Sequence, residues 1–366
     1  MPVMSARLAR PGRLAHRAAP KAAPGTPPRL RDLPPRILFL SDPVEDYVAD
    51  SLFHGLRTLL GPAAVDFPKR NFLYASFPHG RLGDLYGRGF GVYGLLEDVE
   101  TDRRDALERA EAGEFDLVVV GTLGRDWHWW VTARERIPPT TPIAVVDGAD
   151  VPWMYPYGPT WWRSPRRWFL PRAHRRATYF KREWTPATGW LRWYGLGPPR
   201  SSTRLPLERI AISYPAEKIV DEVPAKAKDF ASHVVDPEVA ARLEATSTSY
   251  VFAAEDAYLT DIRQSRFGVT TRKAGWDAMR HYEIAASGTL PCFRGLDRKP
   301  ATCAPHCLVP GRNCLSYRDA DDLFRQLEAI PEDRYGALVQ GALAWARMNT
   351  TQRRAEGFLN ILDLAP

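Results

Sequence analysis

The chain has 366 residues, 45% hydrophobic and 25% charged, which is the composition of a globular protein too long for one core. Its formal net charge of +7 is concentrated in residues 1–35, where seven Arg or Lys oppose one Asp (7 − 1 = +6), so the remainder carries only +1. This balance argues against a nucleic-acid partner, and no apolar run reaches the roughly 20 residues that span a bilayer.

Residues 1–35 are rich in Ala, Pro and Arg and cannot supply a hydrophobic core, so we expect a disordered basic tail. The tail lacks the apolar segment of a signal peptide. A transit peptide would also be rich in Arg, but it would contain more Ser, so a solvated arm is the favoured interpretation. Four Cys in the whole chain are too few for a disulfide framework and indicate a reducing, cytoplasmic location.

Residues 36–220 are expected to form the first domain, in which strands alternate with helices. The strands are predicted at 36–42, 63–67, 115–120, 141–147 and 178–183, and the helices at 47–60 and 102–112. Residues 68–94, rich in Gly and Tyr, are expected to form a long loop. Strands without polar alternation indicate a parallel sheet covered on both faces, which binds ligands beyond the carboxyl ends of its strands.

Residues 153–200 interrupt this pattern with seven of the twelve Trp, and with ten Lys or Arg against one acid, Glu183. Trp and Arg favour the surface of an anionic membrane, so this insert can lie at the inner face of a membrane. Aromatic faces also stack on sugars, which makes an acceptor groove the second interpretation. The third is a loop packed over the sheet, in which Arg side chains cover the Trp rings.

Residues 195–230 contain Pro and charged residues and are expected to be a linker, with a domain boundary near 220 and a second domain over 221–344. The strands of this domain are predicted at 228–235, 250–254, 267–270, 289–293 and 313–317. Its helices are predicted at 237–245, 256–264, 276–287, 319–330 and 334–349, followed by a final helix at 352–362. This alternation indicates a second α/β domain.

The most informative stretch is residues 265–293, which predicts a strand, a basic loop, a helix that ends before Gly288, and another strand. A strand that leads through a loop to a helix N-terminus is a common anion site, because backbone N–H groups and the helix dipole favour phosphate there. We expect a nucleotide to be held here by Glu283, Arg280, Lys273 and His281, with Ser265, Arg266, Thr270 and Thr271 as secondary candidates for phosphate contact.

Each of these side chains also has a simpler explanation. Arg280 and Glu283 are three positions apart and can form a surface ion pair. His281 can be a core histidine bonded to a carbonyl, and Lys273 can be a solvated loop lysine. Their occurrence together on one strand–loop–helix unit favours the phosphate site.

The runs RKAGWDAMRHYEIAASGTLPCFRGLDRKP, NCLSYRDADDL and ARMNTTQRRA resemble the nucleotide-binding half of GT-B glycosyltransferases. The similarity is greatest to bacterial enzymes of surface-glycan synthesis and extends more distantly to exostosin-type transferases. It covers residues 265–360 and is limited to the strand–helix rhythm over 36–185. The resemblance implies two Rossmann-like domains facing across a cleft, with the nucleotide sugar on the second domain, the acceptor on the first, and residues 345–366 returning to the first.

The same resemblance assigns Glu283 to the nucleotide ribose. GT-B enzymes often place a Glu five residues before a Gly, on the helix that precedes a Pro-containing strand, and Glu283, Gly288 and Pro291 match that pattern. The signature often has a second acid eight positions earlier, where this chain has Gly275. The paired-acid signature is therefore incomplete, and Asp277 can take the place of the missing acid.

The predicted function is transfer of a sugar from a nucleotide-sugar donor to a glycan or lipid-linked acceptor in surface polysaccharide synthesis. GT-B enzymes generally use no catalytic metal, so we expect no cofactor and a leaving-group charge offset by basic side chains. Two alternatives stay open: a non-catalytic nucleotide-sugar-binding protein on the same scaffold, and a sugar-nucleotide epimerase.

An inverting transfer needs a carboxylate or His that takes the acceptor proton. Asp147 and Asp150 of the DGAD motif rank first because they follow a clear buried strand, although an Asp-Gly turn with a helix cap explains the motif equally well. Asp42, at the end of the first strand, is the third candidate. Asp126, His128 and His54 rank behind these three.

A zinc site is the remaining alternative, because Cys292, Cys303, Cys307 and Cys314 lie with His306 within 23 residues. The cysteines form no CxxC pair, and Cys292 falls in a predicted strand. Buried thiols are therefore favoured over a metal centre.

Overall fold

The computed structural model describes residues 33–155, 177–185, 207–244 and 246–365, together with residues 158, 163, 165 and 188. The predicted tail and most of the Trp- and Arg-rich insert lie outside the described residues. Within these ranges, no helix has both the length and the hydropathy needed to cross a bilayer.

The first sheet has six parallel strands in the order β2-β1-β3-β4-β5-β6. Its strands are β1 Ile37–Leu40, β2 Ala64–Phe67, β3 Leu117–Val120, β4 Ile143–Asp147, β5 Ala177–Lys181 and β6 Leu207–Arg209. The direction in which strands are added reverses at β1 and β3, which is the switch point where such sheets bind ligands. Strand β6 lies in the segment predicted to be a linker. The sequence did not predict this strand, because LER has no apolar pattern that would indicate one.

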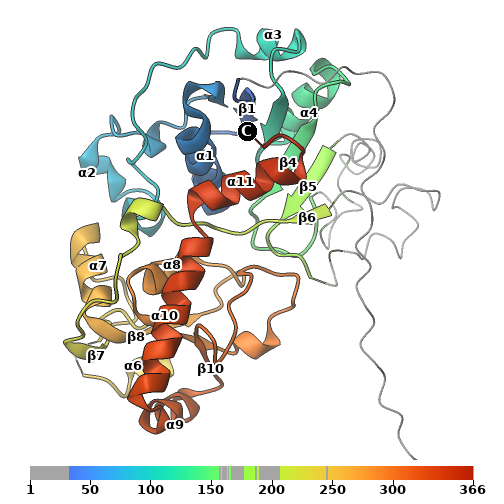
Figure 1. Ribbon diagram of the computed structural model, residues 1–366. Helices are drawn as coiled ribbons and strands as arrows, with labels where there is room; N and C mark the ends of the chain where they lie inside the picture. Colours follow the sequence, from blue (N-terminus) through green and yellow to red (C-terminus); the bar gives the residue numbers. More distant parts are fainter. Residues whose placement is uncertain are drawn as a thin grey trace, which may run out of the picture. The chain divides into compact units, whose positions relative to one another are not determined.

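Helices cover both faces of this sheet (Figure 1). Phe39 and Val119 point to the face that packs on α1 and α11, and Leu38 and Val118 point to the face that packs on α3 and α4. The helices are α1 Tyr47–Leu60, α2 His79–Leu82, α3 Ala106–Glu111, α4 Trp127–Arg136 and α11 Thr351–Ile361. This arrangement confirms the predicted parallel sheet with two covered faces.

The second sheet has four parallel strands in the order β10-β9-β8-β7. Its strands are β7 Lys228–Phe230, β8 Ser265–Thr271, β9 Leu290–Arg294 and β10 Leu315–Tyr317. Its helices are α6 Pro237–Ala240, α7 Glu255–Arg263, α8 Met279–Ala286, α9 Ala320–Ala329 and α10 Glu332–Met348. Two parallel sheets with intervening helices confirm the α/β class, whereas the domain boundary near 220 stays a prediction.

Two predictions for the second sheet are wrong. Residues 250–254 form no strand, because Tyr250 and Phe252 instead pack their rings on Tyr258 of α7, with centroids 5.3 and 5.5 Å away. The helix predicted to begin at Trp276 begins three residues later, at Met279. The backbone N–H of Trp276 is bonded outside the helix, to Glu183 Oε1 at 2.8 Å.

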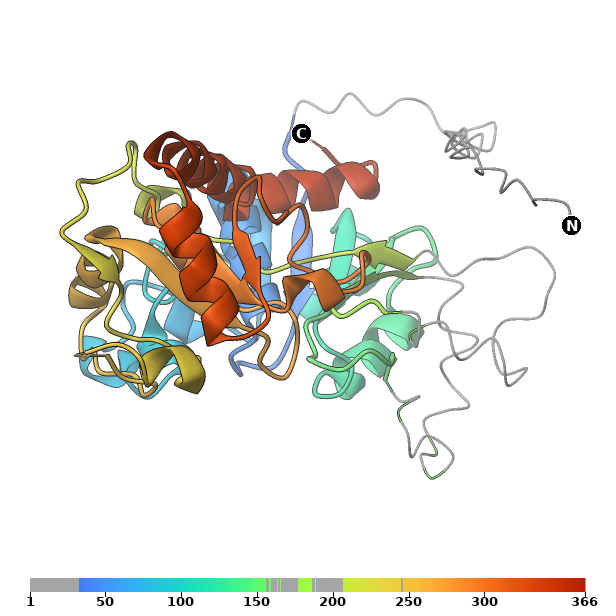
Figure 2. The ribbon, with the colours of Figure 1, turned by 90° about the horizontal axis from the view of Figure 1, so that it is seen from below.

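Helices α10 and α11 connect the two sheets, with α10 lying over the second sheet and α11 over the first (Figures 1 and 2). One hydrophobic cluster continues from Phe39 of β1 through Phe358 of α11 to Trp345 of α10. Helix α11 approaches α1 so closely that a Cβ at Gly55 would lie 2.0 Å from the Thr351 carbonyl oxygen. Only glycine at position 55 permits this approach.

We expect Gly55→Ala to lower the free energy of unfolding by about 1–3 kcal/mol, because the added methyl group overpacks the contact between α1 and α11. Gly357→Ala on α11 is the matched control, since a Cβ there meets no atom within 4 Å. It should raise stability by about 0.5–1 kcal/mol through helix propensity. Urea unfolding measures both, and a neutral Gly55→Ala would contradict the packing described.

Candidate functional site

Glu283 presents a partly satisfied carboxylate on α8, and only 7% of the residue is exposed. Its Oε2 accepts a hydrogen bond from the Tyr258 hydroxyl at 2.7 Å, and no described residue donates to Oε1. Burial raises the pKa of Glu283, and the neighbouring Arg280 charge opposes that rise. One carboxylate oxygen is therefore available to accept a hydroxyl from a ligand.

Arg280 lies one turn before Glu283 and is also buried, with 8% of its surface exposed. Its Nη2 donates to His233 Nδ1 at 2.7 Å, and its guanidinium lies 6.0 and 5.9 Å from the ring centroids of Tyr250 and Tyr258. Among the described residues, none accepts a hydrogen bond from Nε or Nη1. A buried guanidinium with free donors is suited to binding the oxygens of an anion.

Lys273 and Thr271 lie before α8, at the carboxyl end of β8. Thr271 is the last residue of β8, and Lys273 follows in the exposed loop. Desolvation by the surrounding protein and the charge of Arg280 lower the pKa of Lys273. The loop lysine and the helix arginine are thus close enough for their charges to interact.

Two other residues predicted to contact the nucleotide sugar, His281 and Asp277, form hydrogen bonds within the protein instead. His281 is fully buried; its Nδ1 accepts from the Thr270 hydroxyl at 2.8 Å, and its Nε2 donates to the Trp276 carbonyl at 3.0 Å. Asp277 is buried and accepts from the Ile212 backbone at 2.8 Å and from a tyrosine hydroxyl. Their contacts are those of core residues, which was the simpler explanation for His281.

Gly275, where related signatures have an acid, lies against two acids of the first sheet. A Cβ at this position would lie 2.6 Å from Glu183 Oε1 and 2.8 Å from Asp150 Oδ1. Glu183 also accepts from the backbone of Trp276, and its burial raises its pKa. The carboxylates near this position therefore come from the loops after β4 and β5.

Arg266 lies apart from the other predicted phosphate contacts. It is the second residue of β8, at the amino end of the strand, whereas Thr271 marks the carboxyl end. Its Nη2 bonds Glu332 at 2.7 Å, and its guanidinium lies 4.4 Å from the Tyr335 ring centroid. The structure therefore does not bring Arg266 together with Arg280 and Lys273.

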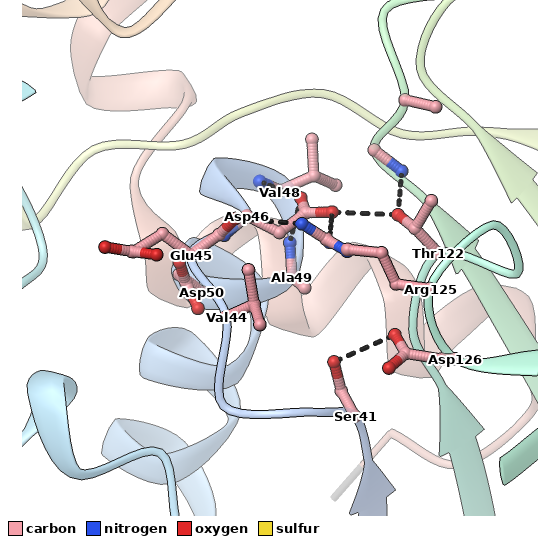
Figure 3. Close-up of polar contacts among 12 residues, drawn as sticks. Ser41, Val44, Glu45, Asp46, Val48, Ala49, Asp50, Thr122, Arg125 and Asp126 are labelled. Atoms are coloured by element: carbon pink, nitrogen blue, oxygen red, sulfur yellow. Dashed lines mark hydrogen bonds and ion pairs between the residues drawn. The ribbon is translucent and has the colours of Figure 1, made fainter. Parts of the chain in front are cut away.

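A second polar network lies at the carboxyl ends of β1, β3 and β4 (Figure 3). Asp46 caps α1 by accepting from the backbone N–H groups of Val48 and Ala49 at 3.1 and 3.2 Å. Its other oxygen accepts from the Thr122 hydroxyl at 2.8 Å and from Arg125. The network therefore ties the loop after β1 to the loop after β3.

A buried ion pair between Arg70 and Asp50 also holds the loop after β1. Both residues are completely inaccessible to solvent. Arg70 donates to the carbonyl oxygens of Asp42 at 2.8 Å and Val44 at 2.9 Å. Asp50 accepts from the Asp46 backbone N–H at 2.8 Å. Residues 41–46 are thus fixed by charge-assisted hydrogen bonds along their length.

The three predicted bases differ in how many hydrogen-bond and ion-pair partners their carboxylates have within the protein. Asp147 is buried, and both its oxygens accept hydrogen bonds, Oδ2 from Lys181 at 3.0 Å and from Tyr179, and Oδ1 from a backbone N–H. Asp150 is half exposed and pairs with Arg182. Asp42 accepts from a tryptophan N–H at 2.9 Å and pairs with a histidine at 3.2 Å.

The lower-ranked candidates for the base also have partners within the protein. Asp126 is fully buried and bonds Ser41 at 3.0 Å and the Asp42 backbone at 2.8 Å. His128 is the histidine that pairs with Asp42. His54 is buried against Thr351 at 3.0 Å, and desolvation lowers its pKa to about 4.

The cysteines form no metal centre in the part of the chain that the structure describes, where no three His, Cys, Asp or Glu side chains are grouped to hold an ion. Cys292, Cys303 and Cys314 are buried free thiols and Cys307 is exposed. Burial raises the pKa of Cys303 and Cys314 to about 12, so these thiols stay protonated.

Sequence reasoning missed the partners that complete the site. Tyr258 and His233 are 25 and 47 residues from the side chains they contact, so no local spacing can show the pairing. Asp46 was detectable, because an Asp immediately before a predicted helix is a common cap.

No protein-family profile and no curated protein sequence matches the chain. Its fold is similar to that of Anabaena HepE in complex with UDP, with 12% identity, 90% of this chain and 99% of that chain covered, and a TM-score of 0.53. Sucrose-phosphate synthase from Thermosynechococcus elongatus has 11% identity, 90% and 98% coverage and a TM-score of 0.51. The N-terminal domain of Candida albicans trehalose-6-phosphate phosphatase has 11% identity, 91% and 98% coverage and a TM-score of 0.51. The chain therefore has the GT-B fold that the sequence predicted.

The occupied His281 generates a pH prediction. Burial lowers its pKa from 6.5 to about 3, so between these values the unfolded chain binds a proton that the folded chain does not. Stability contributed by this group is complete above pH 6.5 and falls on acidification, by up to about 1.4 kcal/mol per pH unit. In urea titrations between pH 6.5 and 4, His281→Asn should reduce the slope of unfolding free energy against pH. The reduction should be up to about 1.4 kcal/mol per pH unit, which corresponds to one proton. An unchanged slope would contradict a buried neutral histidine.

Proposed function

We propose that this protein is a glycosyltransferase that moves a sugar from a nucleotide donor to a glycan or lipid-linked acceptor in surface polysaccharide synthesis. The observation that carries the proposal is the buried pair of Arg280 and Glu283, which have donors and an acceptor that no described residue binds. The GT-B fold supports it, and HepE, which has a similar fold, was crystallised with UDP.

The donor would be held by complementary groups on one turn of α8. The free oxygen of Glu283 can accept hydrogen bonds from vicinal ribose hydroxyls, because an ionised carboxylate only accepts. Arg280 and Lys273 can bind the phosphate oxygens, which carry the opposite charge. Ribose and phosphate are adjacent in a nucleotide, as Glu283 and Arg280 are adjacent on the helix.

The same cations would promote the transfer. As the bond between sugar and phosphate breaks, negative charge develops on the nucleoside diphosphate. Arg280 is already desolvated and held in place by His233, so it can stabilise that charge with little reorganisation. We propose that side chains, rather than a bound metal ion, supply this stabilisation.

Calorimetry with UDP tests the donor site. Glu283→Ala should weaken UDP binding by about 10–100-fold, the loss of a hydrogen bond to a charged group. Arg280→Gln should weaken it at least as much, because the phosphates lose a buried cation.

The matched control is Glu222→Ala, which removes an exposed glutamate from the same half of the chain and should bind UDP like the wild type. Equal UDP affinity for the wild type and Glu283→Ala, with an unchanged unfolding transition, would reject the site. A protein that binds nucleotide sugars but never releases the nucleoside diphosphate would be a binding protein and not a transferase.

A further inference from the structure

The loops after β1, β3 and β4, together with the first turn of α1 and the end of β4, contain seven described acids, and four of them already accept hydrogen bonds on both oxygens. These four are Asp46, Asp50, Asp126 and Asp147. Hydrogen bonds to both oxygens favour the ionised form, so such a carboxylate is a weaker base. Asp42 and Asp150 pair with His128 and Arg182, and each has one oxygen that no described residue binds.

Glu45 is the exception among the described acids of these loops. Its carboxylate makes no hydrogen bond or ion pair with any described residue, and the residue is half-buried. In Figure 3 its side chain extends away from the contacts of Asp46 and Arg125. Glu45 is therefore the one acid of this group that has no partner among the described residues.

The backbone beneath Glu45 is unusually well fixed. Arg125 Nη1 donates to the Glu45 carbonyl at 3.0 Å, and the next residue, Asp46, donates its N–H to Asp50 at 2.8 Å. The preceding carbonyl, of Val44, accepts from Arg70 at 2.9 Å. The side chain therefore projects from a preorganised loop, as groups that take part in proton transfer require.

Glu45 is linked to α8 through Tyr47, two residues along the chain. Tyr47 packs on the hydrophobic cluster that contains Met279 and Tyr282 of α8. Burial, with smaller effects of the Glu283 and Glu45 charges, raises the pKa of Tyr47. A second contact between the same parts of the molecule is made by Gly275, which lies against Asp150. These contacts bring the carboxyl edge of the first sheet to the proposed donor site.

We propose that Glu45 is the general base of the transfer, an assignment that rests on the proposed function. Its carboxylate takes the proton of the acceptor hydroxyl while that oxygen forms a bond to the anomeric carbon of the donor. The bond between that carbon and the diphosphate breaks, and its electron pair leaves with the nucleoside diphosphate. Attack opposite the leaving group inverts the anomeric centre.

Donor hydrolysis by the full chain tests this assignment, with water as the acceptor. A panel of UDP-, GDP- and dTDP-hexoses is screened with the wild type, and kinetics are measured with the donor that releases nucleoside diphosphate fastest. Glu45→Gln should lower kcat by about 100-fold or more, the usual contribution of a general base, with KM and UDP affinity unchanged. Glu45→Asp should recover part of the rate, and Glu97→Gln, at an exposed position, should match the wild type.

Three outcomes would overturn the assignment of Glu45 as the base. The first is a Glu45→Gln rate within a few-fold of the wild-type rate, and the second is a loss of rate in Asp150→Asn instead. The third is a first-formed sugar that has retained its anomeric configuration, as seen by proton NMR. A wild type that binds UDP but hydrolyses no donor also overturns it, while the donor site stands. A wild type that binds no nucleotide overturns the proposed function, and the base with it.

Discussion

A charge that is buried without a full set of partners costs free energy, and this constraint distinguishes the two halves of the site. In the first sheet, Asp46, Asp147 and the Arg70–Asp50 pair are satisfied by the protein itself. On α8, Arg280 has donors and Glu283 has an oxygen that meet no partner in the part of the chain that the structure describes. An anion and a hydroxyl group would complete both residues, which is the physical reason to expect a nucleotide there.

The polar network of the first sheet, whose charges are paired, supports the site on α8, whose charges are not. Charge-assisted contacts from Arg70, Asp50 and Arg125 hold residues 41–46 in one conformation. The backbone of Trp276 is bonded by Glu183, which comes from the loop after β5 and links the start of the α8 segment to the first sheet. Groups from both sheets are thereby positioned before any ligand arrives, and preorganisation of this kind contributes to catalysis in low-dielectric sites.

Local sequence predicted the elements of residues 265–293 well, because the apolar strands and Gly288 act over a few residues. It could not predict the state of each side chain. Asp147 looked like a free base, but the parallel register places Lys181 beside it from a strand 34 residues away. Arg266 looked like a phosphate contact, but β8 begins at Ser265, which puts this arginine at the opposite end of the strand. Such outcomes depend on strand register and on distant partners that sequence periodicity does not contain.

A crystal structure of the full chain with UDP tests the central claim most directly. The account predicts ribose hydroxyls within about 3 Å of the Glu283 carboxylate and phosphate oxygens at a similar distance from Arg280. The competing location is a cavity of about 550 Å³ beside β7, lined by Phe230, Phe267 and Phe324. UDP bound there, with Arg280 and Glu283 left without a ligand, would contradict the account.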